Sequence, residues 1–340
     1  MKGGDEAIES EVAKILGVAI NRAFPEIEAI KEDKIKKKAI DDDARKKAIY
    51  TLITTKLRRV DPFIIPKDII DIACHYLAVI FQAHGPNFST VSACASGAHS
   101  IGVAYDMIKT GRMKACITGG TENPITPLGI TGFTQLDALS KRNEDPVKAC
   151  RPFDKDRDGF ILGQGACVIP LMSLETALKY DAPILAEIVG VGMTGDAKSP
   201  TDPDPESIKA AVRMAIEDAR LNPEDVDCIN PHATSTSIGD KNEAMVIRDI
   251  FGSKPYVSAT KSTTGHLIGA AGAIELAFSA MAIKTGIIPP TINLDNVDPD
   301  CNGLNHVRHS AIEADVNVAI SNSFGFGGHN CVIALKKYTQ

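Results

Sequence analysis

From residue 58 onward the chain alternates short apolar runs with longer segments of helical periodicity, and this alternation restricts the fold more than any other feature. Strands that alternate with helices favour parallel or mixed sheets that helices cover. The same rhythm occurs in residues 58–183 and again in residues 184–340. We therefore expect an α/β fold built from two similar halves.

The expected strands are short and bounded by glycine or polar residues; they are residues 88–93, 114–119, 165–171, 184–191, 228–230, 256–258, 316–321 and 330–335. We expect the run 184–191 to extend the sheet of the first half. The expected helices are residues 66–84, 97 to about 109, 174–180, 207–220, 244–251 and 269–284.

Residues 1–57 differ from the rest of the chain in composition. They are rich in charge and contain no glycine after Gly17. Residues 6–24 and 41–57 have the periodicity of helices, with a charged cluster at 31–38 between them. The sequence thus predicts a separate, atypical helical region ahead of the α/β halves.

The composition is that of a soluble globular protein, with 44% apolar residues, 24% charged residues and a net charge of -6. A clustered basic face is missing from the sequence, so we expect no nucleic-acid partner. No apolar run approaches the length of a membrane span and no signal peptide is evident. The eight cysteines are scattered without the spacing of a metal site, which predicts free thiols in a reducing compartment and no metal ion.

One cysteine, Cys94, lies where an apolar run turns into a helix, within Ser92–Gly97. Its small neighbours permit a sharp turn and close approach of a substrate. The N-terminus of a helix stabilises a thiolate, so we expect a lowered pKa for Cys94 and the highest reactivity among the thiols. The alternative, a packed cysteine at the end of a strand, is about equally favoured by this segment alone.

Two segments of the second half carry histidines. His232 follows a short strand and precedes a hydroxyl-rich loop, a pattern that also suits a helix cap beside a structural histidine. His266 lies five positions after Lys261, on the far side of Gly265. A phosphate-binding turn would need a Gly-Lys-Ser/Thr run with the P-loop spacing, and this segment has none.

Near the C-terminus, residues 322–328 interleave two phenylalanines with three glycines. Glycine allows unusual backbone dihedrals and leaves N–H groups uncovered. The segment therefore suits an oxyanion donor and a mobile gate, or alternatively a tight β-turn.

Together these four segments resemble the β-ketoacyl-acyl-carrier-protein synthases of the elongating type. Residues 151–154, 157–160 and 290–294 add to the resemblance, which covers residues 58–337. It implies a thiolase-like fold of two pseudo-symmetric halves, each with layered α-β-α-β-α elements. It also implies decarboxylative condensation of an acyl thioester with malonyl-acyl carrier protein to give a 3-oxoacyl product in fatty-acid elongation.

The resemblance assigns roles to individual residues. Cys94 would accept the acyl chain, and His232 and His266 would stabilise the enolate formed on decarboxylation. Lys261 would order the site electrostatically, paired with Glu275.

Further residues would line the site and bind substrate. The backbone N–H groups of Cys94 and Phe326 would form the oxyanion hole. Thr234 and Thr236 would contact pantetheine, Phe133 would close the acyl pocket, and Phe324 with Phe326 would form the gate.

The same resemblance implies acyl carrier protein as partner, acyl and malonyl thioesters as substrates, and no cofactor beyond the carrier's phosphopantetheine. A homodimer would form around the strand 88–93. The compartment would be the cytoplasm, or the matrix of a plastid or mitochondrion, since His329 resembles plastid forms.

Within the superfamily, His266 distinguishes the chain from initiating synthases with a Cys-His-Asn set. A second catalytic cysteine, as in biosynthetic thiolases, is missing from residues 325–328. Only 93 residues precede Cys94, fewer than in the family, so we expect an incomplete first half. The alternative function is therefore a weak or inactive ketosynthase-like dimerisation subunit.

Overall fold

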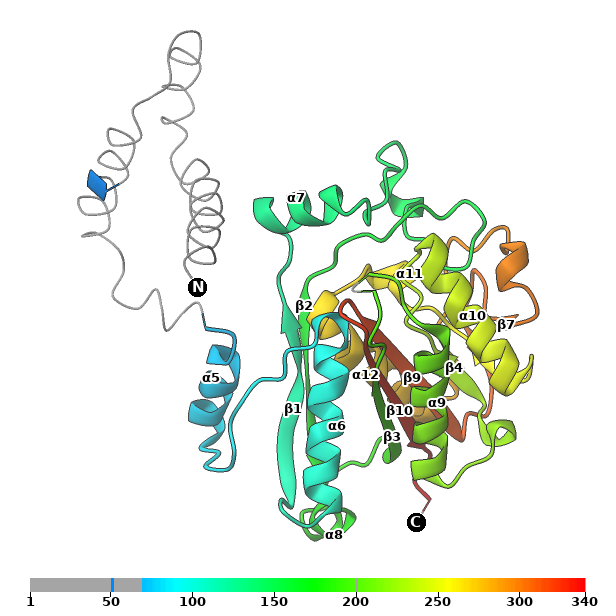
Figure 1. The fold of residues 1–340 in the computed structure, drawn as a ribbon. Helices are drawn as coiled ribbons and strands as arrows, with labels where there is room; N and C mark the ends of the chain where they lie inside the picture. The colour runs from blue at the N-terminus through cyan, green and yellow to red at the C-terminus, as the bar shows by residue number, and fades with distance from the viewer. Residues whose placement is uncertain (1–49, 52–68, 200, 340) are drawn as a thin grey trace. The chain divides into compact units, whose positions relative to one another are not determined.

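The computed structural model describes residues 50–51, 69–199 and 201–339 (Figure 1). The predicted helix 6–24 and the boundary at 57/58 lie outside the described residues. The chain divides into two units at Ile69/Ile70, and the unit that begins at Ile70 holds the predicted second half and the predicted first half from residue 70 onward. The boundary predicted at 183/184 falls inside that unit and stays a prediction.

The larger sheet belongs to the second half and has six strands in the order β3-β10-β9-β4-β5-β7. β10 runs antiparallel to both β3 and β9, while β4, β5 and β7 continue in parallel from β9. The predicted mixed sheet is thus confirmed. Its strands are β3 Glu187–Gly195, β4 Cys228–Asn230, β5 Tyr256–Val257, β7 Asn305–His306, β9 Val318–Gly325 and β10 His329–Lys336.

In the first half, β1 (Ala115–Glu122) pairs with β2 (Gly165–Met172) in an antiparallel ribbon. A second ribbon joins β6 (Ile287–Ile288) to β8 (Ile312–Glu313). The prediction that residues 184–191 extend the first half's sheet is wrong, because β3 pairs with β10 in the six-stranded sheet. An apolar run indicates a strand but does not show which strand it pairs with.

The predicted strand 88–93 is also wrong for the single chain. Residues 86–92 have no regular structure, and Ala93 begins a short 3-10 turn. Side chains hold the segment to the preceding helix: Asn87 Nδ2 donates to Cys74 O at 3.3 Å and Ser89 Oγ donates to Ile70 O at 3.3 Å. A strand exists only where a neighbour completes its hydrogen-bond ladder, and the described residues supply none here.

The helices are α5 Ile72–Phe81, α6 Ser96–Lys109, α7 Pro127–Gln135, α8 Leu174–Lys179, α9 Pro205–Ala219, α10 Ser237–Phe251, α11 Lys261–Thr264 and α12 Ala271–Thr285. α5 is shorter than the predicted helix 66–84, and α10 begins well before the predicted residue 244. Its first two turns contain Gly239 and several polar residues, a composition that suggests a loop when it is considered without tertiary contacts.

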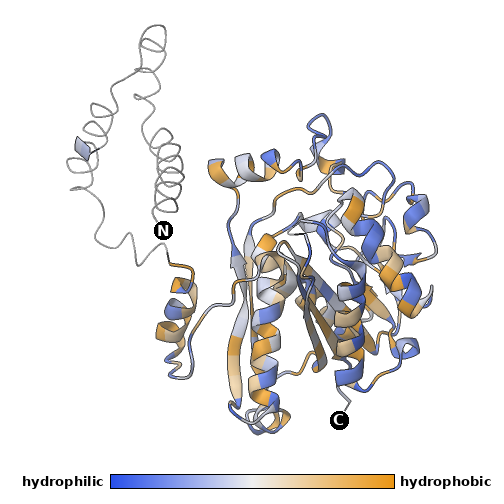
Figure 2. Ribbon diagram, in the orientation of Figure 1, coloured by the Kyte–Doolittle hydropathy of each residue, from blue (hydrophilic) through white to orange (hydrophobic). Residues whose placement is uncertain are grey.

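The elements form layers around two central helices (Figure 1). α6 packs against β1 and α12, while α12 contacts β9 and β2, so both helices lie between the first-half ribbon and the large sheet. α9 covers the other face of that sheet at β3 and β10. Buried apolar residues of α6, α12, β9 and β10 pack into one core cluster between these layers, and Figure 2 shows apolar stretches along these elements. The expectation that no apolar run approaches the length of a membrane span is wrong for one stretch: among the described helices, Ile268–Thr285 is long and apolar enough, because it contains the core helix α12, and 56% of it is buried inside the protein.

The ribbon of the first half resembles the β9–β10 pair of the second half. β9 and β10 have β4 and β3 on their outer edges. Among the described residues, no strand pairs with the outer edge of β1 or of β2. The described part of the first half therefore has fewer strands than the second.

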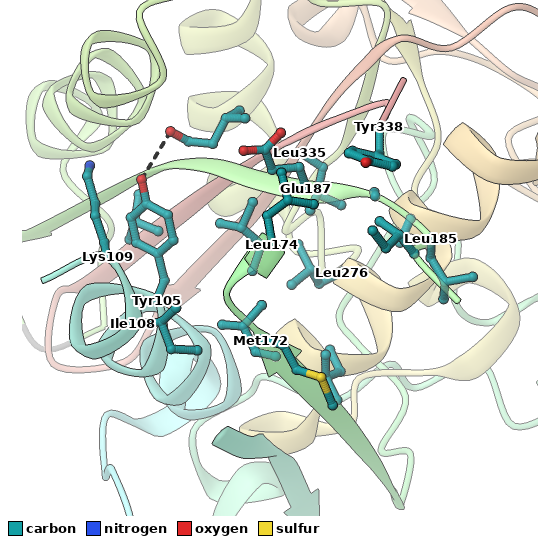
Figure 3. Close-up of a pocket in the computed structure, with 18 of the residues that line it drawn as sticks. Tyr105, Ile108, Lys109, Met172, Leu174, Leu185, Glu187, Leu276, Leu335 and Tyr338 are labelled. Atoms are coloured by element: carbon teal, nitrogen blue, oxygen red, sulfur yellow. Dashed lines mark hydrogen bonds between the residues drawn. The ribbon is translucent and has the colours of Figure 1, made fainter. Parts of the chain in front are cut away.

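An open groove of about 1330 Å³ runs beside β2. Tyr105 of α6, Met172 of β2, Leu276 of α12 and Leu335 of β10 line it (Figure 3). At its rim, the Asp218 carboxylate of α9 accepts hydrogen bonds from Tyr105 Oη at 3.0 Å and from the Val191 amide at 3.2 Å. These bonds fasten α6 and α9 to the edge strand β3.

The close contact of α6 with α12 can be tested with a matched pair of substitutions. A Cβ atom at Gly97 of α6 would lie 2.9 Å from Gly269 O and 3.2 Å from Ala273 N, whereas one at Gly132 of α7 would meet no atom within 4 Å. We expect Gly97→Ala to lower the free energy of unfolding by about 1–3 kcal/mol through overpacking. Gly132→Ala should raise it by roughly 0.5–1 kcal/mol, because alanine favours helices. Chemical denaturation measures both changes; equal stability of the two variants would contradict the packing.

Candidate active site

The candidate nucleophile Cys94 lies in a short 3-10 turn that continues directly into α6. Ala93 adopts the left-handed region with φ 49°, which is strained for a residue with a side chain. Ser96 holds the turn, since its Oγ accepts from the Ser92 amide at 2.9 Å and donates to Ala93 O at 2.8 Å. The result is a rigid elbow with the cysteine at the N-terminus of the helix.

The end of β9 packs closely against this elbow. A Cβ atom at Gly325 would lie 2.6 Å from Ser92 O and 3.1 Å from the Cys94 amide nitrogen, so only glycine fits. The next residue, Phe326, offers its backbone N–H to the Cys94 sulfur, as does the N–H of Cys94 itself. The two predicted oxyanion donors are thus brought together at one atom.

The expected low pKa of Cys94 is wrong. Burial raises the pKa of its thiol to about 11, because an anion loses its hydration there. The backbone N–H of Phe326 and the positive charge of Lys261 act in the opposite direction but do not compensate for burial. Sequence reasoning counted the helix terminus but not the depth at which tertiary packing places the sulfur.

The structure brings Cys94, His232 and His266 together from three separate segments. The cysteine sulfur and one nitrogen of each imidazole all lie within 4.8 Å of one another. The two rings are 5.3 Å apart between centroids and nearly perpendicular at 84°. His232 follows β4, and His266 follows α11 just ahead of the core helix α12. The predicted three-residue cluster is therefore present in the fold.

Both imidazoles are held neutral. Burial lowers the pKa of His232 and of His266 well below the ordinary value, and the charge of Lys261 lowers both further. Within the described residues, both ring nitrogens of His266 and Nδ1 of His232 have no hydrogen-bond partner. A neutral imidazole has one N–H to donate, and here it remains available to a substrate.

Lys261 and Glu275 form a fully buried ion pair, with Nζ and Oε1 2.5 Å apart. Burial raises the pKa of Glu275 to about 7, against the opposing effect of the Lys261 charge. The pair places a positive charge beside the two histidines and the cysteine without contacting solvent. The predicted Lys261–Glu275 pairing is present.

Sequence reasoning missed Glu243, a buried residue of α10. Its carboxylate accepts from the His232 amide at 2.8 Å, from the Ala233 amide at 2.7 Å and from Asn322 Nδ2 at 2.9 Å. It thus fastens the histidine loop to β9. The available signal was the position of Glu243, one residue before the apolar face that starts at Ala244. The predicted helix began at residue 244 and therefore did not include it.

A second buried acid, Asp240, organises the hydroxyl-rich loop. It accepts from the Ser235 amide at 3.1 Å and the Thr236 amide at 3.3 Å, and from the Phe153 amide at 2.9 Å. The hydroxyls of Thr234 and Thr236 then lie 3.1 Å apart. The two predicted pantetheine-binding residues are therefore side by side on a braced loop.

Phenylalanines surround the histidines. Phe133 contacts Phe160, with ring centroids 5.4 Å apart, and Phe160 contacts His266 at 5.2 Å. Phe160 belongs with Cys94 to one apolar cluster that Phe133 packs against, so it joins the predicted pocket wall although sequence reasoning did not assign it there.

The two residues predicted to form the gate differ in position. Phe324 is buried at the end of β9, 5.7 Å from the His232 ring. Phe326 lies in the turn before β10. Their role as a gate stays a prediction.

Known protein families match both parts of the chain. The β-ketoacyl synthase N-terminal domain matches residues 9–177, and the β-ketoacyl synthase C-terminal domain matches residues 185–295. A 3-oxoacyl-[acyl-carrier-protein] synthase 2 of Coxiella burnetii is 47% identical over 291 residues, which cover 84% of this chain and 70% of that protein. The enzyme of the same name from Synechocystis is 48% identical over 285 residues, covering 82% of this chain and 68% of that one.

Solved structures show the same fold. A β-ketoacyl synthase from Burkholderia phymatum superposes with a TM-score of 0.81 at 33% identity, over 86% of this chain and 72% of that one. The ketosynthase complex described as a type II PKS acyl-carrier protein with its ketosynthase bound to the hexaketide gives 0.80 at 30% identity, over 82% and 70% of the two chains.

These similarities confirm the thiolase-like fold and extend over both halves of the chain. Because nearly half of the aligned residues are identical to those of curated condensing enzymes, this chain belongs to the β-ketoacyl synthase family.

Proposed function

We propose that this chain catalyses the condensation of an acyl thioester with malonyl-acyl carrier protein to give 3-oxoacyl-acyl carrier protein in fatty-acid elongation. The observation that carries the proposal is the cluster of Cys94, His232 and His266 with donor atoms within 4.8 Å. The names of the bacterial relatives, 3-oxoacyl-[acyl-carrier-protein] synthase 2, support it.

In the first step the Cys94 sulfur attacks the carbonyl carbon of the acyl thioester. The backbone N–H groups of Cys94 and Phe326 stabilise the oxyanion of the tetrahedral intermediate. The carrier thiolate leaves and takes up the proton that the cysteine lost. A thioester on Cys94 results, and no charge remains buried beside the apolar wall.

In the second step His232 and His266 donate N–H hydrogen bonds to the thioester oxygen of the malonyl group. The C–C bond to the carboxylate breaks, carbon dioxide leaves, and the electron pair forms an enolate whose charge lies on that oxygen. The enolate carbon attacks the carbonyl carbon of the Cys94 thioester, and the sulfur leaves as a thiolate that takes up a proton from solvent to restore the thiol. Neutral imidazoles suit this role, since a donor that carried a full charge would already be solvated or paired.

The alternative of an inactive dimerisation subunit does not account for the site. Glu243, Asp240 and the Lys261–Glu275 pair are buried charged groups that serve to hold the histidine loop and the cysteine environment. Burying charges is costly unless they are paired. A subunit kept only for contacts would not need them.

Acyl carrier protein is the proposed partner, and its phosphopantetheine arm would bring the substrates past Thr234 and Thr236. The ketosynthase complex with its carrier supports this assignment. We propose no cofactor of the chain's own. The bacterial origin of the relatives supports the cytoplasm over an organelle as the compartment.

We propose that the segment 88–93 pairs with its copy across a two-fold axis. Phe88 and Val91 are 49% and 67% exposed, and their segment pairs with no strand in the part of the chain that the structure describes. Exposed edges of this kind are normally covered, and a two-fold interface lets one segment cover its copy.

The raised pKa of Cys94 predicts a pH dependence for its alkylation. Because the pKa is about 11, the thiol form predominates at neutral pH and the thiolate fraction grows about tenfold with each pH unit. The rate of iodoacetamide labelling at Cys94 should therefore rise with a slope near one between pH 7 and 9. Peptide mass mapping measures it, with the buried Cys331 as an unlabelled control. A plateau below pH 8 would contradict the burial argument.

The histidine roles predict separate effects on the two steps. His232→Ala or His266→Ala should lower malonyl decarboxylation by about 10²-fold or more, the scale of losing one oxyanion donor. Acylation of Cys94, followed by intact-mass measurement, should decline much less. His75→Ala, on the exposed face of α5, serves as the matched control. Decarboxylation at the wild-type rate in both site variants would exclude the proposed role.

The dimer is tested by sedimentation at micromolar concentration. The wild-type chain should sediment as a dimer of 36.2 kDa subunits. Val91→Asp should dissociate it, because an unpaired charge would be buried at the two-fold. Val147→Asp, at a position 79% exposed and outside the segment, should leave the dimer intact. Wild-type protein that remains monomeric would show that another element covers residues 88–93.

A further inference from the structure

The fold assembles a set of metal-ligating atoms that sequence spacing gave no reason to expect. The sulfur of Cys94 and the imidazole nitrogens of His232 and His266 lie within 4.8 Å of one another. One thiolate and two imidazoles are ligand types that zinc sites use, and three protein ligands leave a fourth position open, as in catalytic zinc sites. No other group of this kind occurs among the described residues.

The donor atoms are free as well as close. His266 is 1% exposed, yet neither of its ring nitrogens has a hydrogen-bond partner in the described part of the chain, and Nδ1 of His232 has none either. Buried polar atoms without a partner are costly and invite a ligand. In a resident zinc site the second nitrogen of each histidine usually donates to a carboxylate or carbonyl, and here it does not. The cluster therefore suits a transient rather than a permanent ion.

The separations are close to those that a zinc ion requires. Zn–S bonds of about 2.3 Å and Zn–N bonds of about 2.0–2.1 Å place the donors of a tetrahedral site roughly 3.5 Å apart. The donor atoms, which lie up to 4.8 Å apart, are therefore more widely spaced by roughly 1.3 Å, so binding requires the three side chains to move closer together.

The surrounding charge does not exclude a cation. Lys261 would repel it, and the direct ion pair with Glu275 offsets part of that repulsion. Binding also displaces the thiol proton of Cys94. The charge of the site therefore rises by one unit, because a divalent ion enters and one proton leaves. The carboxylate of Glu243 accepts a hydrogen bond from the His232 amide. Its negative charge offsets part of the positive charge that the metal adds.

We propose that Cys94, His232 and His266 together bind one thiophilic divalent cation, Zn²⁺, as a reversible inhibitor. Binding forms a Zn–S and two Zn–N bonds and releases the thiol proton to solvent. It occupies the nucleophile and both hydrogen-bond donors at once, so it blocks acylation and decarboxylation. The inhibition rests on the proposed function, whereas the binding itself does not.

Binding is measured on the full-length protein with Co²⁺ as a spectroscopic substitute for Zn²⁺. One equivalent of Co²⁺ should produce a thiolate-to-cobalt charge-transfer band and the visible bands of a tetrahedral site, and Zn²⁺ should displace them. The band should vanish in Cys94→Ser, and His266→Ala should weaken binding at least about tenfold. Cys74→Ser, which removes a thiol of α5, is the matched control and should bind like the wild type. Thermal melting checks that each variant is folded.

A second measurement follows Cys94 directly. Micromolar Zn²⁺ should protect Cys94 from iodoacetamide in mass mapping, and a chelator should restore labelling. Unchanged labelling with Zn²⁺, or the same cobalt spectrum in Cys94→Ser as in the wild type, would overturn the proposal. A different outcome is that Zn²⁺ protects Cys94 but the metal-free chain makes no 3-oxoacyl product. That outcome would retain the metal site and reject the proposed function. If Zn²⁺ leaves the rate of condensation unchanged, the metal site is rejected and the proposed function is retained.

Discussion

Backbone contact between α6 and the start of α12 is the constraint on which the site depends. A Cβ atom at Gly97 of α6 would lie 2.9 Å from Gly269 O, in the turn before α12, and one at Gly272 of α12 would lie 3.0 Å from the Ala98 amide nitrogen of α6. Cys94 stands at one end of this contact, and His266 stands just ahead of the helix on the other side. Larger residues would separate the two helices and with them the nucleophile and its histidine. The small-residue packing therefore sets the reaction geometry as well as the core.

Burial sets the proton states of the site in a consistent way. It raises the pKa of the Cys94 thiol and lowers the pKa of both imidazoles, since each loses the hydration that favours its charged form. The resting site thus contains a neutral thiol and two neutral donors. Negative charge develops only when a substrate reacts, on the oxygens to which the backbone N–H groups of Cys94 and Phe326 and the two imidazoles donate in the proposed mechanism. Lys261, in its ion pair with Glu275, adds a positive charge beside these groups.

Much of the candidate site could be predicted from sequence, and the limits of that prediction have physical causes. Cys94, His232, His266 and Lys261 each stand in a short segment with a recognisable local pattern, and all four converge in the fold. Glu243 and Phe160 were missed because their roles come from partners far away in the chain. The pKa of Cys94 was predicted in the wrong direction, since a helix terminus is visible in a sequence but depth of burial is not.

By itself the sequence determined the α/β rhythm, most of the strands and helices, and the residue types of the site. Hydrophobic periodicity and glycine placement are local properties, and they specify elements without fixing their neighbours. Only the tertiary structure decided that β3 joins the second half's sheet and that residues 88–93 find no ladder partner among residues 69–199 and 201–339. It also decided that a cysteine and two histidines lie within 4.8 Å, because that distance depends on contacts between segments far apart in the chain: the packing of α6 against α12 and the loop after β4 that Glu243 holds.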